Sequence, residues 1–282
     1  MNYRSLLVLL DHSAACAARL RLAMRLARER DCHLVGLAPT GLIDIPPDTR
    51  AATSLTDYAA RAWDALREQA EQAAQRFRDE CVAGGVKSFE TVVDEADKAA
   101  STIRHAHCSD LVVLTQAPPE AADHRLAQAL VEEVVLHSAR PTLVIPHAGR
   151  FEQVGTQVLV AWDDTREAAR AVSDALPILC HSSRVQLVQW LPPGASASAD
   201  PTRHARLDAV QRWLMWHGVA SEVGIEITEI GIASAMLSRA ADMGADLIVM
   251  GAYGHARWAQ RVLGGATRGM FASMTVPVLM SH

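Results

Sequence analysis

Short apolar segments alternate with longer segments of helical periodicity along the whole chain. The apolar segments lack the polar alternation of half-exposed strands, so we expect strands buried on both faces of a parallel sheet. They are predicted near residues 5–11, 32–38, 88–93, 110–115 and 142–146, and again near 156–162, 184–190, 221–227, 246–250 and 277–281. Amphipathic segments between them, such as 57–80, predict helices. This alternation predicts an α/β fold with an open, doubly wound sheet.

The pattern occurs twice in the chain. Residues 6–13 resemble residues 158–165, since each is an apolar run that ends in an acidic residue and a small polar one. The offset is 152 residues there (6 to 158) but 136 residues later (110 to 246), so the first half has extra residues, which we place between Pro39 and Gly84. We predict two tandem domains, 1–148 and 155–282, each a five-stranded parallel sheet flanked by helices.

Composition narrows the classes of function. The 282 residues carry a net charge of −5, which argues against nucleic acid as a partner because phosphate binding needs a basic surface. No apolar run approaches the ~20 residues of a membrane span, so no membrane partner is expected. The five cysteines are scattered without a C-x-x-C pair, and the twelve histidines show no metal-binding spacing. We expect a cytoplasmic protein to which no metal is assigned.

A glycine-rich loop carries the candidate chemistry. The strand that ends at Met250 is followed by Gly251-Ala252-Tyr253-Gly254, then by nine residues, then by Gly264-Gly265-Ala266-Thr267. Glycines directly after a parallel strand let the backbone turn sharply and approach a ligand closely. A second glycine pair at the start of a helix presents free N–H groups and a positive helix end to an anion. Together they predict a cradle for a polyphosphate.

With these residues the chain resembles the universal stress protein (UspA) family, as a member with two tandem Rossmann-like domains of the adenine nucleotide α-hydrolase type. The resemblance covers essentially the whole chain. It implies that the second half binds ATP, with or without Mg²⁺ on the phosphates. Asp163 would contact the adenosine, and Trp190 would offer a backbone group to the adenine. The remaining binding residues would be Met250, Gly251, Gly254, Gly264, Gly265, Ala266 and Thr267.

One position departs from the family pattern. The family usually has Ser or Thr after the third glycine, where this chain has Gly265. The missing hydroxyl removes one neutral hydrogen bond, worth roughly 0.5–1.5 kcal/mol, which lowers affinity by up to about tenfold. Thr267 is a candidate to replace that hydroxyl. Arg257, Arg261 and Arg268 are equally compatible with phosphate contacts and with a solvated surface.

The first half provides a comparison within the same chain. At the offset of 136, Gly251, Gly254 and Gly264 correspond to Thr115, Pro118 and Gln128. Pro118 has no N–H group to offer and its φ is fixed. Two carboxylates, at residues 132 and 133, would lie close to the phosphates. We therefore expect a degenerate site that does not bind ATP in the same way.

The resemblance implies a stress-response protein in which the adenine nucleotide acts as a sensed or regulating ligand. One alternative is an interaction scaffold that binds no nucleotide. Another is an enzyme that hydrolyses ATP slowly or transfers an adenylyl group, although no paired general acid and base is visible in the sequence. Trp162 is expected in the core, and His255 on the surface.

The resemblance also implies that the two halves form a pseudo-twofold pair within one chain, as separate subunits of the family do when they dimerise. The last strands of the halves, Thr142–Ile145 and Val276–Met280, are the candidates for the pairing edge. A homodimer of the whole chain is also open.

Overall fold

The computed structural model describes residues 2–41, 56–194, 201–254 and 265–282. All ten predicted strands are present there, and each end lies within two residues of its predicted position. The first half contains β1 (Ser5–Leu9), α1 (Ala14–Arg30), β2 (His33–Pro39), α2 (Thr56–Ala83), β3 (Phe89–Asp94), α3 (Lys98–Ala106), β4 (Leu111–Thr115), α4 (His124–His137) and β5 (Thr142–Ile145). The second half contains β6 (Gln157–Ala161), α5 (Arg166–Leu179), β7 (Arg184–Leu191), α6 (Pro201–Trp216), β8 (Glu222–Ile227), α7 (Ile232–Met243), β9 (Leu247–Gly251), α8 (Gly265–Ser273) and β10 (Val278–Ser281).

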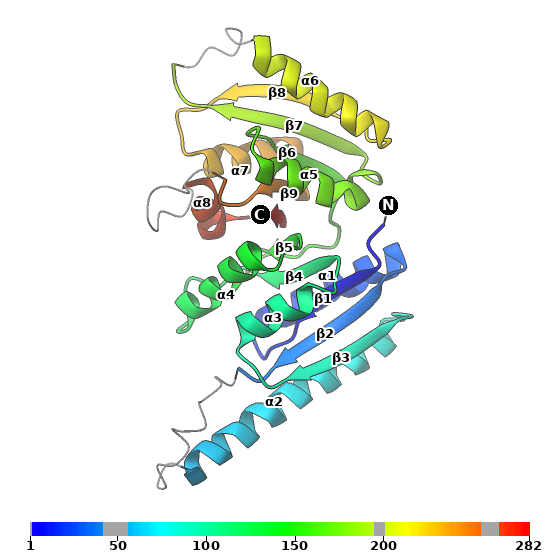
Figure 1. Cartoon of the computed structure of the whole chain (residues 1–282), viewed down its shortest axis with the longest axis vertical. Helices are drawn as coiled ribbons and strands as arrows, with labels where there is room; N and C mark the ends of the chain where they lie inside the picture. The colour runs from blue at the N-terminus through cyan, green and yellow to red at the C-terminus, as the bar shows by residue number, and fades with distance from the viewer. Residues whose placement is uncertain (1, 42–55, 195–200, 255–264) are drawn as a thin grey trace.

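The strands form one continuous ten-stranded sheet in the order β3-β2-β1-β4-β5-β10-β9-β6-β7-β8 (Figure 1). All neighbours are parallel except β5 and β10, which pair antiparallel with Leu143 opposite Leu279. This confirms the expected pairing of the halves through their last strands. The predicted domain boundaries at residues 148 and 155 stay a prediction, because the sheet continues across both halves.

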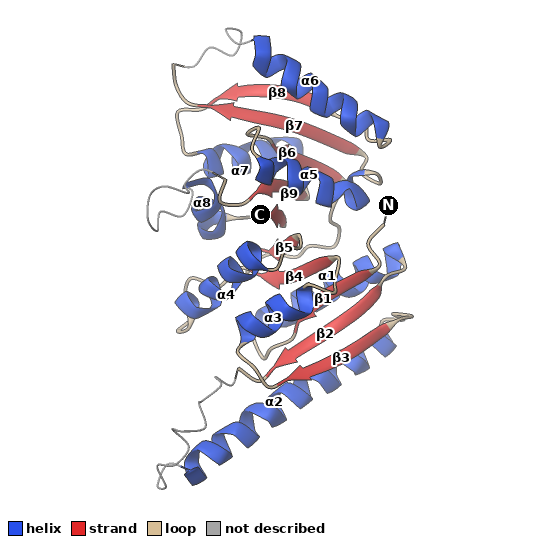
Figure 2. Cartoon of the chain, in the orientation of Figure 1, coloured by secondary structure: helices blue, strands red, loops and turns tan. Residues whose placement is uncertain are grey.

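Helices cover both faces of the sheet (Figure 2). Helices α1, α2, α5 and α6 contribute to one core cluster, and α3, α4, α7 and α8 contribute to the other. Trp162 is buried in the first of these clusters, as expected. The central strands are buried on both faces, whereas the edge strands β3 and β8 are partly exposed. Alternating side chains along each central strand therefore enter opposite cores, which explains the uninterrupted apolar runs.

The extra residues of the first half contribute to a longer helix. Helix α2 has 28 residues, whereas its counterpart α6 has 16. Phe77 of α2 is fully buried, and its ring lies 2.9 Å from the position that a Cβ at Gly36 would take. Glycine at position 36 therefore lets the long helix pack directly on β2. Among the described residues, no helix is both long and apolar enough to cross a membrane.

Side chains link the two halves beyond the β5–β10 pairing. Buried Gln116, which follows β4, donates from Nε2 to the carbonyl of Phe271 in α8 at 2.6 Å. Its Oε1 lies 2.9 Å from Nδ1 of His147. On the other face, the Tyr3 hydroxyl donates to the carbonyl of Asp174 in α5 at 2.7 Å. These contacts fix α5 and α8, the two helices of the second half that begin beside the candidate site.

Candidate functional site at the carboxyl ends of β6 and β9

The strand order reverses between β6 and β9 in the second half, and between β1 and β4 in the first. Ligands of doubly wound sheets bind outside the carboxyl ends of the strands at such a switch point. Asp163 follows β6, Gly251 ends β9, and α5 and α8 begin nearby in the chain. The geometry of these residues decides what this end of the sheet can hold.

Asp163 is exposed, and its carboxylate shapes the turn before α5. Oδ1 accepts from the hydroxyl of Thr165 at 2.6 Å and from its backbone N–H at 3.2 Å. The Thr165 hydroxyl oxygen in turn accepts from the N–H of Ala168, which caps the helix. Asp164 has a left-handed backbone (φ 62°) and pairs with Arg206 of α6. The two neighbouring carboxylates therefore have different surroundings, and only Asp163 orders the start of α5.

Gly251, which ends β9, and Gly254, which follows it, lie directly against the first turn of α5. A Cβ at Gly251 would lie 2.6 Å from the backbone nitrogen of Ala168, closer than any side chain tolerates. A Cβ at Gly254 would lie 3.2 Å from Oγ1 of Thr165 and 3.3 Å from Oε2 of Glu167. The close approach of α5 therefore requires glycine at position 251, and a side chain at position 254 would fit only if Thr165 and Glu167 shifted by a few tenths of an ångström. It also brings Asp163, through Thr165, next to the glycine loop.

Tyr253 and Thr267 fasten this loop to the start of α8. Tyr253 has a left-handed backbone (φ 61°), and its N–H donates to Oγ1 of buried Thr267 at 3.2 Å. The Thr267 hydroxyl oxygen therefore accepts a hydrogen bond within the loop while its own O–H can still donate, so its role as a replacement for the hydroxyl that Gly265 lacks stays a prediction. A Cβ at Gly265 would meet nothing within 4 Å, so the backbone at the helix start is accessible.

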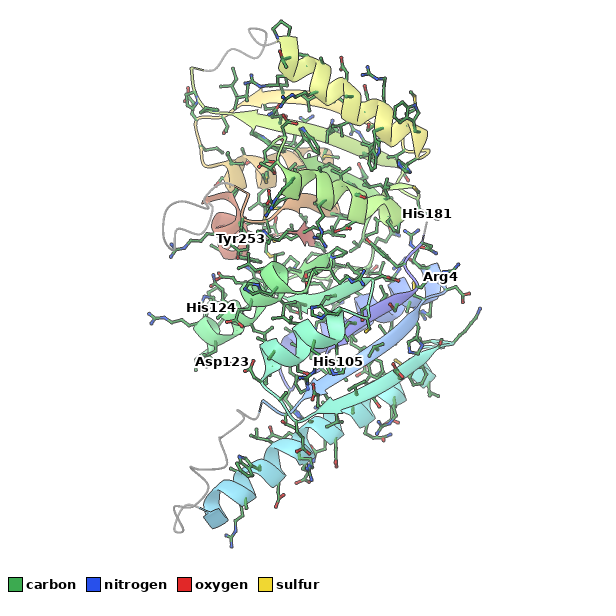
Figure 3. All side chains as sticks on the ribbon, viewed as in Figure 1. Arg4, His105, Asp123, His124, His181 and Tyr253 are labelled. Atoms are coloured by element: carbon green, nitrogen blue, oxygen red, sulfur yellow. The ribbon has the colours of Figure 1, made fainter. Side chains whose placement is uncertain are left out.

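The aromatic ring of Tyr253 lies at the junction of the two halves, near α8 and α4 (Figure 3). It contacts the ring of His282 edge-on, with centroids 6.3 Å apart. Burial of the phenol, followed by the nearby charge of Glu132 in α4, raises its pKa above the usual range. The phenolic oxygen is buried and has no hydrogen-bond partner among the described residues. The glycine loop thus packs, through Tyr253, against the core cluster that contains residues of both halves.

Of the other predicted site residues, some lie within helices and strands of the structure and some lie outside the residues that it describes. Met250 is buried in the core, and Ala266 is half-buried in the first turn of α8. The indole of Trp190 is buried and donates from Nε1 to Glu226 at 3.0 Å, which leaves only its backbone for a ligand. Gly264 lies outside the described residues, as do His255, Arg257 and Arg261. Exposed Arg268 is in the second turn of α8.

Glu167 was not predicted from the sequence, yet it lies at the centre of this arrangement. Its side chain is only 6% exposed and pairs with Arg166. Burial by itself raises the pKa of Glu167. The hydrogen bonds from Arg166 and from its own backbone, together with the charges of Arg166 and His282, lower the pKa by a larger amount. Its pKa therefore lies below the ordinary value, and a buried carboxylate lies beside Gly254.

The switch point of the first half is filled by a side chain of the protein itself. Arg19 of α1 is 3% exposed and donates to the Leu9 carbonyl at 2.8 Å, to Oγ1 of Thr115 at 2.9 Å and to Oδ2 of Asp11 at 2.8 Å. Asp11 and Thr115 are the counterparts of Asp163 and Gly251. The sequence comparison identified these two positions but missed the guanidinium between them.

The corresponding position of the second half is Ala171, at the offset of 152 residues that relates the starts of α1 and α5. Its methyl side chain is fully buried and cannot reach the strand ends. The two halves therefore differ most at the place where the fold binds ligands.

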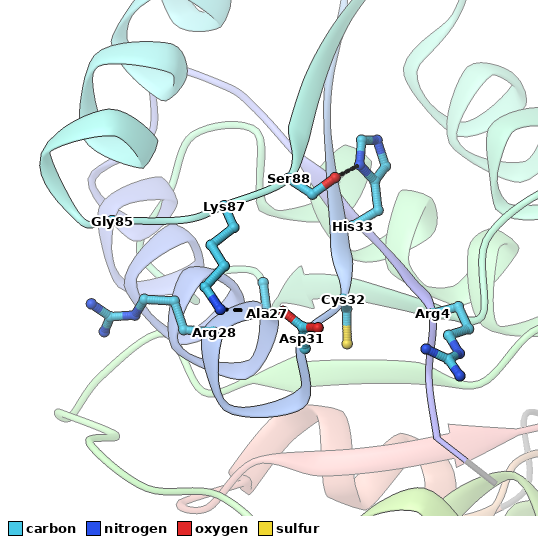
Figure 4. Close-up of a pocket in the computed structure, with 9 residues that line it drawn as sticks. All are labelled: Arg4, Ala27, Arg28, Asp31, Cys32, His33, Gly85, Lys87 and Ser88. Carbon is cyan, nitrogen blue, oxygen red and sulfur yellow. Dashed lines mark hydrogen bonds and ion pairs between the residues drawn. The ribbon is translucent and has the colours of Figure 1, made fainter.

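A cavity of about 500 Å³ lies at the opposite end of the sheet, between the amino ends of β1, β2 and β3 (Figure 4). Its polar side chains do not converge on one point: Arg4 and Arg28 lie on opposite sides. His33 is bonded to Ser88 at 2.7 Å, and Lys87 lies 3.8 Å from Asp31. We therefore do not assign the candidate site to this cavity. Within the described part of the chain, no three His, Cys, Asp or Glu side chains cluster as metal ligands would.

Comparison with known proteins is consistent with this fold. Residues 156–282 match the model of the universal stress protein family. A universal stress protein from Archaeoglobus fulgidus DSM 4304 is 18% identical, with a TM-score of 0.74 over 98% of this chain and 95% of that one. A structure described as a universal stress protein from Pseudomonas aeruginosa UCBPP-PA14 is 17% identical, with a TM-score of 0.62 over 99% and 93%. No curated protein matches the chain.

Proposed function

Since the second half of the chain belongs to the universal stress protein family and the whole chain has that family's tandem fold, we propose that it is a stress-response protein whose second half binds an adenine nucleotide as a regulatory ligand. The nucleotide, ATP in the first instance, would lie outside the carboxyl ends of β6 and β9. Asp163 would bind the ribose, the backbone of Trp190 the adenine, and the loop of Gly251 and Gly254 with the start of α8 the phosphates.

The observation that supports this proposal best is the difference between the two switch points. In the first half Arg19 fills the space between Asp11 and Thr115. In the second half the equivalent residue, Ala171, is too short to fill this space. The glycine loop that begins at Gly251 takes the place of Thr115, and the N–H groups at the start of α8 are accessible beside it. A helix N-terminus that faces a glycine loop suits an anionic ligand. On this proposal the first half binds no nucleotide and serves as a partner domain.

Calorimetric titration with ATP and Mg²⁺ tests the proposal in the full chain. We expect binding by the wild type, and affinity lower by roughly 10- to 100-fold in Asp163→Ala, since hydrogen bonds to charged groups contribute about 1.5–3 kcal/mol. Asp123→Ala is the matched control, because Asp123 is an exposed acid before α4 whose side chain caps nothing. Nucleotide-free wild type that gives no heat, or equal affinities of both variants, would refute the proposal.

A second function has one observation in its favour. The packing of α5 against Gly251 and Gly254 accounts for both glycines without a ligand. An interaction scaffold that retains the loop but binds no nucleotide would have the same geometry. The scaffold predicts a silent titration together with an intact fold, so the same experiment separates the two functions.

A further inference from the structure

We propose that Glu167 makes the second-half site select adenine nucleotides by their number of phosphates, so that metal-free ATP binds more weakly than AMP. This inference rests on the proposed function and adds a specificity-determining residue to it. The carboxylate lies beneath the glycine loop that would hold the phosphates, and it is absent from the equivalent place in the first half.

The position of Glu167 is fixed by the start of α5. It is the second residue of that helix, and its Oε2 lies 3.3 Å from the point where a Cβ of Gly254 would be. A phosphate bound to the N–H groups of this loop would approach the carboxylate closely. Two unit charges about 6 Å apart, at an effective dielectric constant near 20, repel strongly enough to change affinity on the order of a hundredfold.

The positive partner of Glu167 does not remove this effect. The side chain of Arg166 is 60% exposed, whereas that of Glu167 is 6% exposed. The field of the solvated guanidinium is screened by water and salt, while the buried carboxylate acts through the protein interior. A phosphate on the loop would therefore be repelled by a carboxylate whose charge Arg166 compensates only in part.

The fold itself does not require an acid here. The position equivalent to Glu167 in the first half is Ala15, in the first turn of α1, and that helix forms and packs on β1 and β4 without an acid there. Thr165 already caps α5 through its hydroxyl. Glu167 is thus an addition to the second half alone, where the glycine loop is.

The test measures binding of adenosine, AMP, ADP and ATP by calorimetry, first with a metal chelator and then with Mg²⁺. Wild type should bind metal-free ATP at least tenfold more weakly than AMP. Glu167→Gln keeps the shape of the side chain. It should raise the affinity for metal-free ATP at least tenfold and leave the affinity for adenosine unchanged within twofold. Mg²⁺ should reduce the difference between wild type and variant, because it neutralises phosphate charge.

Asp164→Asn is the matched control, because it removes a neighbouring carboxylate that is paired with Arg206, and asparagine tolerates the left-handed backbone of that position. It should retain the wild-type order of affinities. Metal-free ATP that binds wild type as tightly as AMP would overturn the inference while the proposed function stands. A Glu167→Gln variant in which the affinity for adenosine changes as much as the affinity for ATP would also overturn the inference. If neither protein binds any of the four compounds, the proposed function fails and this inference with it.

Discussion

Replacement of Arg19 by Met tests whether the first-half switch point is held together by its own guanidinium. The substitution leaves a side chain of similar length and removes three hydrogen bonds, to the Leu9 carbonyl, the Thr115 hydroxyl and the Asp11 carboxylate. Arg19 is 3% exposed, so water cannot easily replace these bonds. The Asp11 carboxylate would remain, partly buried and without its counter-ion.

The expected loss follows from that geometry. Removing one partner of a fully buried ion pair costs about 3–5 kcal/mol. The Asp11 side chain is 24% exposed and keeps the hydrogen bonds from Ser13, which reduces the cost. We therefore expect the free energy of unfolding to fall by about 2–4 kcal/mol at neutral pH. Arg21→Met, on the exposed side of the same helix, should change it by no more than about 0.5 kcal/mol.

Urea denaturation followed by circular dichroism measures both variants, and pH provides a second readout. Burial raises the pKa of Asp11, but Arg19 and the hydrogen bonds from Ser13 bring it below its ordinary value of 3.8. The stabilisation is therefore complete above pH 3.8 and is lost as the pH falls through the lower folded-state pKa. The difference in free energy of unfolding between wild type and Arg19→Met should therefore become smaller as the pH falls below 3.8. Equal stabilities of the two variants at neutral pH would refute the reasoning.

Two further substitutions test the loop and the junction of the halves. Gly265→Ser restores the hydroxyl usual in the family at a position with open space, so ATP affinity measured by calorimetry should rise by up to about tenfold; an unchanged affinity would mean that this hydroxyl makes no ligand contact. Gln116→Leu leaves the Phe271 carbonyl and His147 without their partner and should lower the thermal unfolding midpoint, with a loss of about 1–3 kcal/mol. A midpoint unchanged within error would show that water replaces the lost contacts.

The fold could be predicted from the sequence because the central strands are buried on both faces. The apolar run at 110–115 could only be a short buried segment, and it forms β4 (Leu111–Thr115). The offset between the repeats also located the extra length of the first half, part of which lengthens α2. Pairing of the last strands followed from the family resemblance, and the register that places Leu143 opposite Leu279 confirms it.

The two charged residues of the switch points could not be identified as readily, because each lies in a helix that carries other charged residues, such as Arg21 and Arg25 in α1 and Arg166 and Arg170 in α5. A signal for Arg19 existed in its spacing from Ala23, Leu26 and Ala27, which places it on the buried stripe of α1. Glu167 similarly lies four residues before buried Ala171. Spacing alone marks such residues as unusual, but only the three-dimensional arrangement shows which strand ends they reach.

The two halves therefore have the same order of strands, but their first helices place different side chains at the switch point. In the first half α1 brings a buried cation that donates hydrogen bonds to Asp11 and Thr115. In the second half α5 brings a buried anion beside an accessible glycine loop. The loop after β4 contacts the other half through Gln116, and Tyr253 in the loop after β9 packs against the core cluster to which α4 contributes. A ligand that moved the glycine loop would therefore disturb the core cluster in which α4 packs, which gives the proposed nucleotide a physical route to a regulatory effect.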